Sequence, residues 1–349
     1  MKKYTYLLII LLLSMITIFG LLRLGKIEIN FQTLSRVNGF WLFLGFVIFY
    51  VSIVARGLRW QHILRTMGWP VGFVYSQTLL TAGLFISSVL PARAGDIGRV
   101  AMLKRDYQIP ISQAIASLAA ERALDVFSVL ILALFGAIWA LQGRILAEAA
   151  QLMTGTAVLF TIGLVSLLGM PSFEGWLRQP GWVWRATPAL IRPIYEKAVT
   201  FGFSMVHGVR SLGEKPIALT AIVLESFVIW LCDALIVYCV LLSLGISASF
   251  NVSLVSAMIG VLATIVPLMP AALGQYEAGV IGLLILLGVP PAESTLAALL
   301  VRFINLWSFI PVSGLITYVF GFSRALSLNS ESLTPGEIPM PQSTAPIES

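Results

Sequence analysis

The chain has 349 residues, of which 58% are hydrophobic and only 11% are charged, and its mean hydropathy is +0.93. Soluble domains carry roughly 25% charged residues, so this composition excludes an ordinary soluble domain and indicates an integral membrane protein. The formal net charge of +6 does not indicate nucleic-acid binding. The basic residues lie mainly between apolar segments, where they orient a membrane protein and contact anionic lipid headgroups.

The N-terminal part of the chain is expected to contain two spanning helices. Residues 4–22 form an apolar run without a small-residue cleavage site after it, and the run exceeds the roughly 7–15 residues of a signal-peptide core. We therefore expect an uncleaved first helix whose N-terminus is cytoplasmic. A second span is expected over 39–55. It is followed by Arg56, Arg59 and Arg65, which we interpret as the mark of a cytoplasmic end.

Residues 72–90 are apolar enough to cross the membrane, but a full crossing would place a group of basic residues outside the cell. These residues are Arg93, Arg99, Lys104 and Arg105. Basic loops tend to stay in the cytoplasm, so we expect a re-entrant hairpin that enters and leaves from that side. Pro91 and Gly95 supply the break in the helix. Such non-helical backbone is tolerated only against protein or a wet cavity.

The rest of the chain is expected to continue as alternating crossings. The expected elements are a long outward helix at 112–142, a return at 152–170, a cytoplasmic connection at 171–215, an outward span at 216–243, a second hairpin at about 252–289 entered from outside, and a last helix at 291–320. This path keeps both termini and most basic residues in the cytoplasm. Residues 327–349 are rich in Ser, Pro and Glu and are expected to form a disordered tail.

Two parts of the chain resemble each other. Residues 90–99, LPARAGDIGR, match 269–278, MPAALGQYEA, and residues 110–125 match 290–305. The repeat units cover about 72–142 and 252–320, and their hairpins are expected to enter from opposite faces. Inverted repeats with broken helices are a common transporter plan, with the site at their interface.

These elements together define the predicted fold. We predict an all-α polytopic membrane protein with about six spanning helices and two re-entrant helical hairpins in inverted repeats, organised as one domain over 1–326.

Ionisable residues within the apolar segments are the candidates for a functional site, because charges at membrane depth are costly and rare. The candidate translocation path consists of Arg93, Asp96, Arg99, Glu121, Arg122, Asp125, Glu277 and Arg302. The first repeat carries most of these residues, so we expect the first copy to be strongly charged and the second to be plainer.

Each constellation has a structural alternative. Glu121 and Asp125 share one helix face, with Arg122 available to Asp125 at i, i+3; they serve either substrate and coupling ions or an ion-pair network that locks the long helix to the first hairpin. Arg93 and Arg99 flank the helix break and either bind a lipid phosphate or anchor the hairpin at the cytoplasmic interface.

The second repeat offers a similar choice. Glu277 either accepts hydrogen bonds from free backbone N–H groups at the second break or contacts substrate. It is also the candidate partner of Arg302. Glu225 and Asp233 lie eight positions apart on one helix face and either pair with other helices or line the cavity.

The candidate carboxylates, with Glu225 and Asp233 included, outnumber the candidate arginines Arg93, Arg99, Arg122 and Arg302. A surplus of negative charge in a low-dielectric site is costly. We therefore expect one or more carboxylates to hold a proton or to face a cation, and Glu121 or Asp125 to link proton movement to transport.

No soluble catalytic motif, metal-ligand spacing or cofactor-binding pattern is present. His62 and His207 are isolated, and Cys232 and Cys239 are separated along one helix by about 10 Å, too far for a disulfide between them. The sequence thus predicts no catalytic residues, no metal and no cofactor, and the protein is not expected to be an enzyme.

The ordered set LPARAGDIGR, AERALD, MPAALGQYEAG and the helix of Arg302 resembles the transmembrane region of the lysylphosphatidylglycerol synthase/flippase family, over about residues 5–325. The resemblance implies a free-standing member that translocates lipids between leaflets and lacks the soluble aminoacyl-transfer domain. The second motif of the family reads closer to Pro-Gly-Gly-Leu-Gly, whereas this chain has Pro270-Ala-Ala-Leu-Gly274. That departure implies a less flexible second break.

The expected function is the flipping of a lipid, or of a lipid-linked headgroup, across the cytoplasmic (inner) membrane of a prokaryote. The expected partners are membrane lipids with anionic or zwitterionic headgroups, with no nucleic acid and with a homo-oligomer left open. The alternatives are an ion-coupled small-solute transporter and a membrane enzyme acting on polyprenyl phosphates. Such an enzyme would need a nucleophile beside the arginines, and the first hairpin offers only Ser87 and Ser88.

Overall fold

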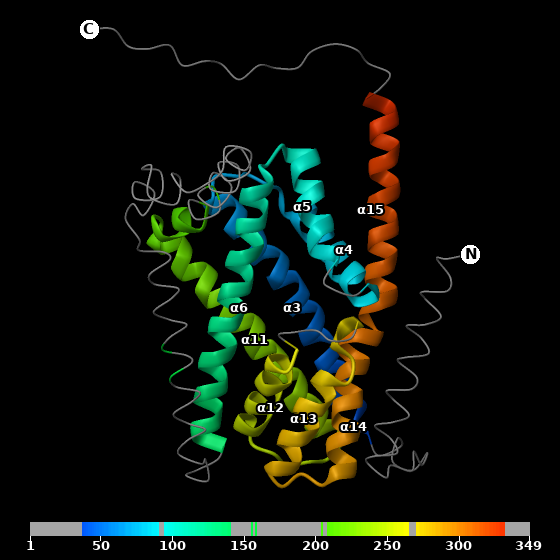
Figure 1. The fold of residues 1–349 in the computed structure, drawn as a ribbon. Helices are drawn as coiled ribbons and strands as arrows, with labels where there is room; N and C mark the ends of the chain where they lie inside the picture. The colour runs from blue at the N-terminus through cyan, green and yellow to red at the C-terminus, as the bar shows by residue number, and fades with distance from the viewer. Residues whose placement is uncertain are drawn as a thin grey trace, which may run out of the picture.

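The computed structural model (Figure 1) describes residues 37–90, 94–140, 208–264 and 270–331 and the single positions 155, 158 and 204. Every regular element in these ranges is a helix, and they contain no strand. The all-helical class predicted from the sequence is therefore confirmed for the part of the chain that is described. The predicted spans at 4–22 and 152–170 and most of the connections at 23–38 and 171–215 lie outside the described residues, although positions 155 and 158 are helical.

Four stretches of the described chain are long and apolar enough to cross a membrane. They are α3 (Gly39–Thr66), α6 (Ile111–Ala140), α11 (Pro216–Ser243) and the continuous stretch Pro291–Phe320. The last consists of α14 (Pro291–Arg302), the π-helical turn η2 (Phe303–Trp307) and the first part of α15 (Phe309–Glu331). These four correspond to four of the six spans predicted from the sequence.

The ends of these helices follow from local sequence. The Asn38 side chain accepts a hydrogen bond from the backbone N–H of Phe40 at 3.0 Å and so caps the start of α3. Pro216 and Pro291 occupy the first helical positions of α11 and α14, where the missing N–H of proline costs nothing.

Two predicted boundaries differ from the structure. The second span does not end near residue 55, because α3 continues to Thr66 and carries Arg56, Arg59 and Arg65 as helical residues. Arg59 is fully buried, whereas the cytoplasmic position of this end of α3 stays a prediction. At the other end of the chain, α15 extends to Glu331, so residues 327–331 of the segment predicted to be disordered are helical; residues 332–349 are not described.

Two helical hairpins interrupt the pattern of long helices. The first consists of α4 (Phe73–Val89) and α5 (Ala94–Tyr107). The second consists of α12 (Phe250–Leu262), the short turn η1 (Pro270–Ala272) and α13 (Gln275–Leu286). In Figure 1 the α4–α5 hairpin occupies the upper part of the bundle and the α12–α13 hairpin the lower part. Both helix breaks thus occur where the sequence predicted them.

The first hairpin is closed by glycine. A Cβ atom at Gly95 would overlap the carbonyl oxygen of Gly83, so α4 and α5 approach each other at backbone distance there. Only glycine leaves room for this close contact between the two helices. The close contact explains Gly95 of the LPARAG motif more directly than the wide range of backbone dihedrals open to glycine.

The two repeats contact each other reciprocally. In each repeat the second hairpin helix packs on the long helix that follows it, α5 on α6 and α13 on α14. In each repeat the first hairpin helix packs on the long helix of the other repeat, α4 on α15 and α12 on α6. Such exchange of equivalent contacts is what a two-fold relation between two copies produces. The internal similarity of the sequence therefore extends to the packing.

The turns between hairpin and long helix also match. Gln108 has φ 54° and Gly288 has φ 93°, and these residues occupy equivalent positions, with each turn followed by a buried residue, Ile109 or Val289, and a proline. Left-handed backbone at the C-terminus of a helix is a common way to end it. The two copies therefore end their second hairpin helix in the same way, although the first copy uses glutamine at a position that favours glycine.

The tip of the second hairpin is strained. Ala271 and Ala272 have φ values of 52° and 49°, a left-handed conformation that disfavours residues with a Cβ atom. Their carbonyl oxygens accept hydrogen bonds from Nη2 of Arg302 at 3.2 and 3.0 Å. The side chain of the long helix thus holds the backbone in this conformation, and alanine makes the break stiffer than glycine would.

We predict that Ala271→Gly and Ala272→Gly each stabilise the protein by about 1 kcal/mol, because glycine adopts positive φ without the steric cost. Thermal unfolding of the purified protein in detergent measures the effect. The control is Ala278→Gly on α13, where Ala278 is exposed and helical and the same substitution destabilises by about 0.5–1 kcal/mol. A fall in stability at all three positions would contradict the strained turn.

Candidate functional site

Five of the predicted site residues meet where α5 packs on α6. Asp96 and Arg99 lie on the first half of α5, and Glu121, Arg122 and Asp125 lie on α6. Arg93 lies outside the described residues. The remaining two, Glu277 and Arg302, form a separate pair in the second repeat.

These side chains and Arg59 form a closed ring of alternating charge. Arg99 contacts Glu121 at 2.7 Å and Asp96 at 3.4 Å. Arg122 contacts Asp96 at 3.2 Å and Asp125 at 3.6 Å. Arg59 closes the ring, with its Nη1 2.7 Å from Asp125 and its Nη2 3.7 Å from Glu121. Each arginine therefore touches two carboxylates and each carboxylate touches two arginines.

Arg59 is the ring member that the sequence analysis missed. Its side chain is 0% exposed, and it also donates a hydrogen bond from Nη1 to Ser226 on α11 at 3.0 Å. The prediction took Arg59 as one of three arginines that mark the cytoplasmic end of the second span. The signal for a longer helix was the spacing of Arg56, Arg59 and Trp60, which continues the apolar pattern of α3 beyond residue 55.

Aromatic side chains complete the surroundings of the ring. The guanidinium of Arg99 lies 3.9 Å from the ring centroid of Trp60, and the indole N–H of Trp230 donates to Asp125 Oδ1 at 3.1 Å. A cation over an indole face and a charge-assisted hydrogen bond both stabilise charge away from water. The ring therefore ties α3, α5, α6 and α11 together.

The ring corrects the expectation of surplus negative charge. With Arg56 and Arg59 added, the arginines equal the candidate carboxylates in number. Asp233 pairs with Arg56 at 3.1 Å and Glu225 contacts His62 at 2.6 Å. The charge count therefore no longer requires a protonated carboxylate, and proton coupling at Glu121 or Asp125 stays a prediction. Glu225 and Asp233 pair with α3, one of the two roles that the sequence left open.

Arg122 differs from the other two arginines of the ring. The side chains of Arg59 and Arg99 are 0% and 1% exposed, whereas that of Arg122 is 38% exposed. All contacts of Arg122 with carboxylates in the described residues are 3.2 Å or longer, against 2.7 Å for the shortest contacts of the other two. Arg122 is therefore the ring cation that is accessible to a ligand.

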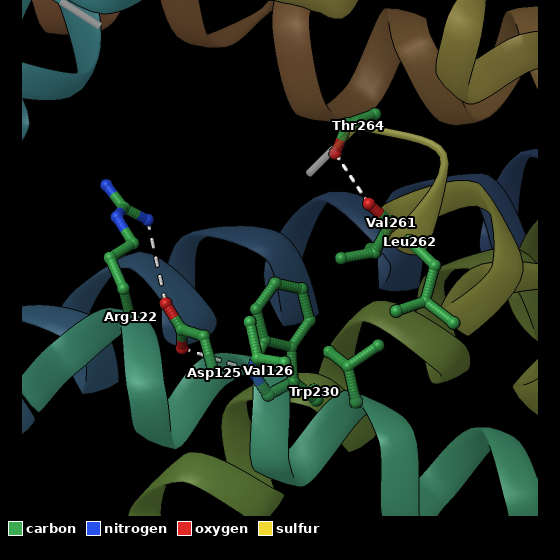
Figure 2. A pocket seen from close by; sticks show the side chains of 8 residues that line it. Arg122, Asp125, Val126, Trp230, Val261, Leu262 and Thr264 are labelled. Carbon is green, nitrogen blue, oxygen red and sulfur yellow. Dashed lines mark hydrogen bonds and ion pairs between the residues drawn. The ribbon is translucent and has the colours of Figure 1, made fainter. Parts of the chain in front are cut away.

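A cavity of about 310 Å³ opens beside Arg122. Its polar end is formed by Arg122 and Asp125, as Figure 2 shows. Val126 and Val129 of α6 and Trp230 of α11 form one wall, and Val261, Leu262 and Thr264 at the end of α12 form the other. The cavity thus joins a charged end to apolar walls, between the first and second repeats.

The second repeat holds one compact ion pair. Arg302 Nε donates to Glu277 Oε1 at 2.7 Å, and Glu277 Oε2 accepts from the backbone N–H of Gly274 at 2.8 Å. Both features were proposed from the sequence, the first as the partner of Arg302 and the second as the structural role of Glu277. The guanidinium also lies 4.7 Å from the ring centroid of Tyr276. This pair is closed, and Arg302 is 8% exposed.

The two arginines of the long helices play equivalent roles. Arg122 and Arg302 are matched positions of the repeats, and each contacts a carboxylate at the third position of the preceding hairpin helix, Asp96 on α5 and Glu277 on α13. A carboxylate there also suits the positive end of the helix dipole. The shared contact fixes each hairpin to its long helix.

Within the described ranges, no group of three or more His, Cys, Asp or Glu side chains has the arrangement of a metal site. Cys232 and Cys239 are free thiols. The carboxylates of the ring contact arginines.

The comparisons with known proteins agree with the architecture. A family model described as the lysylphosphatidylglycerol synthase TM region matches residues 4–313. The chain is 29% identical over 321 residues to a protein named glycosyltransferase AglD of Haloferax volcanii, covering 83% of this chain and 49% of that protein. The chain thus spans about half the length of that relative.

Two further relatives match over most of their length. A UPF0104 membrane protein of Methanothermobacter thermautotrophicus is 26% identical, with 86% of this chain and 89% of the relative covered. A UPF0104 membrane protein of Pyrococcus horikoshii is 24% identical, with 88% and 94% covered. No solved structure matches the chain.

We predict that Arg59→Gln destabilises the protein by about 3–5 kcal/mol, because it leaves buried carboxylates without their cation. Thermal unfolding in detergent measures the loss. Arg59→Gln combined with Asp125→Asn is expected to recover part of it, since a carboxylate is removed with the arginine.

The matched control is Arg210→Gln. Arg210 and Glu214 form a surface pair whose side chains are 39% and 57% exposed, so its loss costs about 1 kcal/mol or less. Equal effects of the two single substitutions would show that the ring is not a buried network.

Proposed function

The chain belongs to the family of the lysylphosphatidylglycerol synthase transmembrane region, and from that premise we propose that it translocates a lipid, or a lipid-linked headgroup, between the leaflets of a prokaryotic cytoplasmic membrane. The chain is a multi-pass membrane protein, and its relatives named above come from prokaryotes. We also propose that both termini lie in the cytoplasm.

The single observation that carries the proposal is the accessible guanidinium of Arg122 at the end of an apolar-walled cavity. A polar headgroup cannot enter hydrocarbon without a partner, and a charged group at the bilayer centre costs at least about 2.5–3.5 kcal/mol. Arg122 supplies that partner, while the acyl chains remain in the surrounding lipid. The other two arginines are held by carboxylates, so the ring offers one cation without exposing a net charge.

The hairpins are proposed to be re-entrant, with inverted topology. Their position at opposite ends of the bundle and the reciprocal packing of α4 on α15 and α12 on α6 support this arrangement. Transporters built in this way place the binding site between the repeats, near the membrane midplane. The cavity is lined by α6 of the first repeat and by α12 of the second, and this supports a binding site between the repeats.

An enzyme acting on polyprenyl phosphates is the second candidate, and the relative named as a glycosyltransferase favours it. The two serines of the first hairpin argue against a nucleophile there. Ser87 Oγ accepts a hydrogen bond from the backbone N–H of Gly95 at 3.2 Å, and Ser88 Oγ donates to the carbonyl of Leu84 at 2.9 Å. Neither contacts an arginine of the ring. The ion-coupled small-solute transporter stays an alternative, and no observation in the described residues favours it.

We predict that the purified protein, reconstituted into liposomes, accelerates the transbilayer movement of a fluorescent phospholipid. Arg122→Gln is expected to slow that movement about tenfold or more, because a charge-assisted contact of the headgroup is lost. Chemical quenching of the outer leaflet measures the rate.

The control is Arg210→Gln, since Arg210 pairs only with Glu214 across an exposed helix turn in the described residues. Its rate is expected to equal that of the wild type. Wild-type rates in Arg122→Gln, with normal folding, would contradict the role of Arg122.

A labelling experiment tests the topology. Lys104 near the end of α5 and Glu293 at the start of α14 are exposed and lie at corresponding ends of the two repeats. In a background with Cys232→Ser and Cys239→Ser, we expect Lys104→Cys to react with a membrane-impermeant reagent only from the cytoplasm. Glu293→Cys is expected to react only from outside. Labelling of both from the same side would rule out inverted hairpins.

A further inference from the structure

The polar end of the cavity presents two groups of opposite charge. Arg122 reaches it as the accessible cation, and Asp125 is held 3.6 Å from it (Figure 2). Asp125 Oδ1 is occupied, because it accepts from Arg59 at 2.7 Å and from Trp230 at 3.1 Å. Asp125 Oδ2 accepts no hydrogen bond from the described residues. The site therefore combines an accessible guanidinium with a carboxylate oxygen that accepts no hydrogen bond from the described residues.

The surroundings fix the acceptor in place. Arg59 is fully buried, and its Nη1 donates hydrogen bonds to both Asp125 and Ser226. The guanidinium of Arg56 lies over the Trp230 ring, 4.7 Å from the centroid. Asp125 therefore cannot rotate freely toward a ligand, and a ligand must bring its own donor to Oδ2. A ligand that displaces water from Asp125 Oδ2 must replace the lost hydrogen bond. A headgroup without a donor cannot do so and therefore binds more weakly.

The size of the cavity limits the ligand. A volume of about 310 Å³ is at the lower end of the roughly 300–1,000 Å³ of small-molecule sites. The volume is sufficient for one small headgroup. The walls of Val126, Val129 and Leu262 offer no hydrogen bonds from their side chains, so they suit the first carbons of an amphiphile.

We propose that this cavity is a binding site for a small phosphodiester headgroup that carries an N–H or O–H donor next to its phosphate. Arg122 binds the phosphate oxygens and Asp125 Oδ2 accepts from the ammonium or hydroxyl group. The apolar walls contact the lipid part. The inference rests on the proposed function and deepens it, since it states which headgroups the path selects.

The test is a binding assay on the full chain in detergent with short-chain lipids of equal acyl length. Dihexanoyl phosphatidylethanolamine and dihexanoyl phosphatidylglycerol carry donors. Dihexanoyl phosphatidylcholine and dihexanoyl phosphatidylmethanol carry the same phosphate without a donor. We expect the first two to bind about tenfold tighter than the second two, the scale of one hydrogen bond to a charged group. Equal affinities for the ethanolamine and choline lipids would overturn the proposal.

A variant locates the binding without disturbing the ring. Val126→Phe fills the cavity from α6 and is expected to abolish the binding of the ethanolamine lipid. The matched control is Val228→Phe, because Val228 on α11 is 52% exposed and lies outside the cavity; its affinity is expected to equal that of the wild type. Undiminished binding in Val126→Phe would place the site elsewhere.

The source of the phosphate is tested with soluble glycerophosphoethanolamine, which has the headgroup without acyl chains. Weaker binding than that of the lipid supports a lipid ligand, and equal binding overturns that assignment. The binding result is independent of transport. Donor-selective binding without lipid movement in liposomes would contradict the proposed function but support the headgroup site. Lipid movement without any headgroup preference in binding would contradict the headgroup site alone.

Discussion

The structure depends on buried arginines whose charges are neutralised by neighbouring carboxylates. Arg59 and Arg99 are almost completely buried, where an unpaired cation would cost more than the helix packing around it returns. Each is neutralised by carboxylates from two positions, and the resulting ring connects α3, α5 and α6. Because the ring closes only when the first hairpin lies against the long helix, the same contacts that balance the charge also define where the hairpin sits.

The two repeats share this scaffold but differ in chemistry. Arg122 and Arg302 are equivalent, yet Arg302 is enclosed by Glu277 and by the carbonyls of Ala271 and Ala272, whereas Arg122 faces a cavity. Asp125 in the first repeat is replaced by Asn305 in the second, and Asn305 Oδ1 has no hydrogen-bond partner in the described residues. A carboxylate there would have required another cation. The second copy therefore has a closed ion pair at its helix break, whereas the first copy has a partly exposed arginine beside a cavity.

Much of this arrangement was predictable from the sequence. Helix breaks at Pro91–Gly95 and Pro270–Gly274, the pairing of Arg302 with Glu277, and the cluster of Asp96, Arg99, Glu121, Arg122 and Asp125 all follow from local patterns and from the repeat. Arg59 did not, because the tendency of arginines to mark cytoplasmic ends is statistical and cannot distinguish a loop from a helix that continues into protein. The closure of the ring is a long-range contact between α3 and α6, and no spacing along the chain encodes it. The left-handed alanines also followed from tertiary contacts, since alanine by itself favours right-handed backbone.

The most direct measurement is the coupling free energy between Arg99 on α5 and Glu121 on α6, obtained from the stabilities of Arg99→Gln, Glu121→Gln and the double variant. If the ring forms as described, each single substitution leaves a buried charge uncompensated, and the double variant is much more stable than the sum of the two losses predicts. The coupling is then at least about 1 kcal/mol. Additive losses would show that the two side chains do not interact, and the account of a charge ring that positions the hairpin would be wrong.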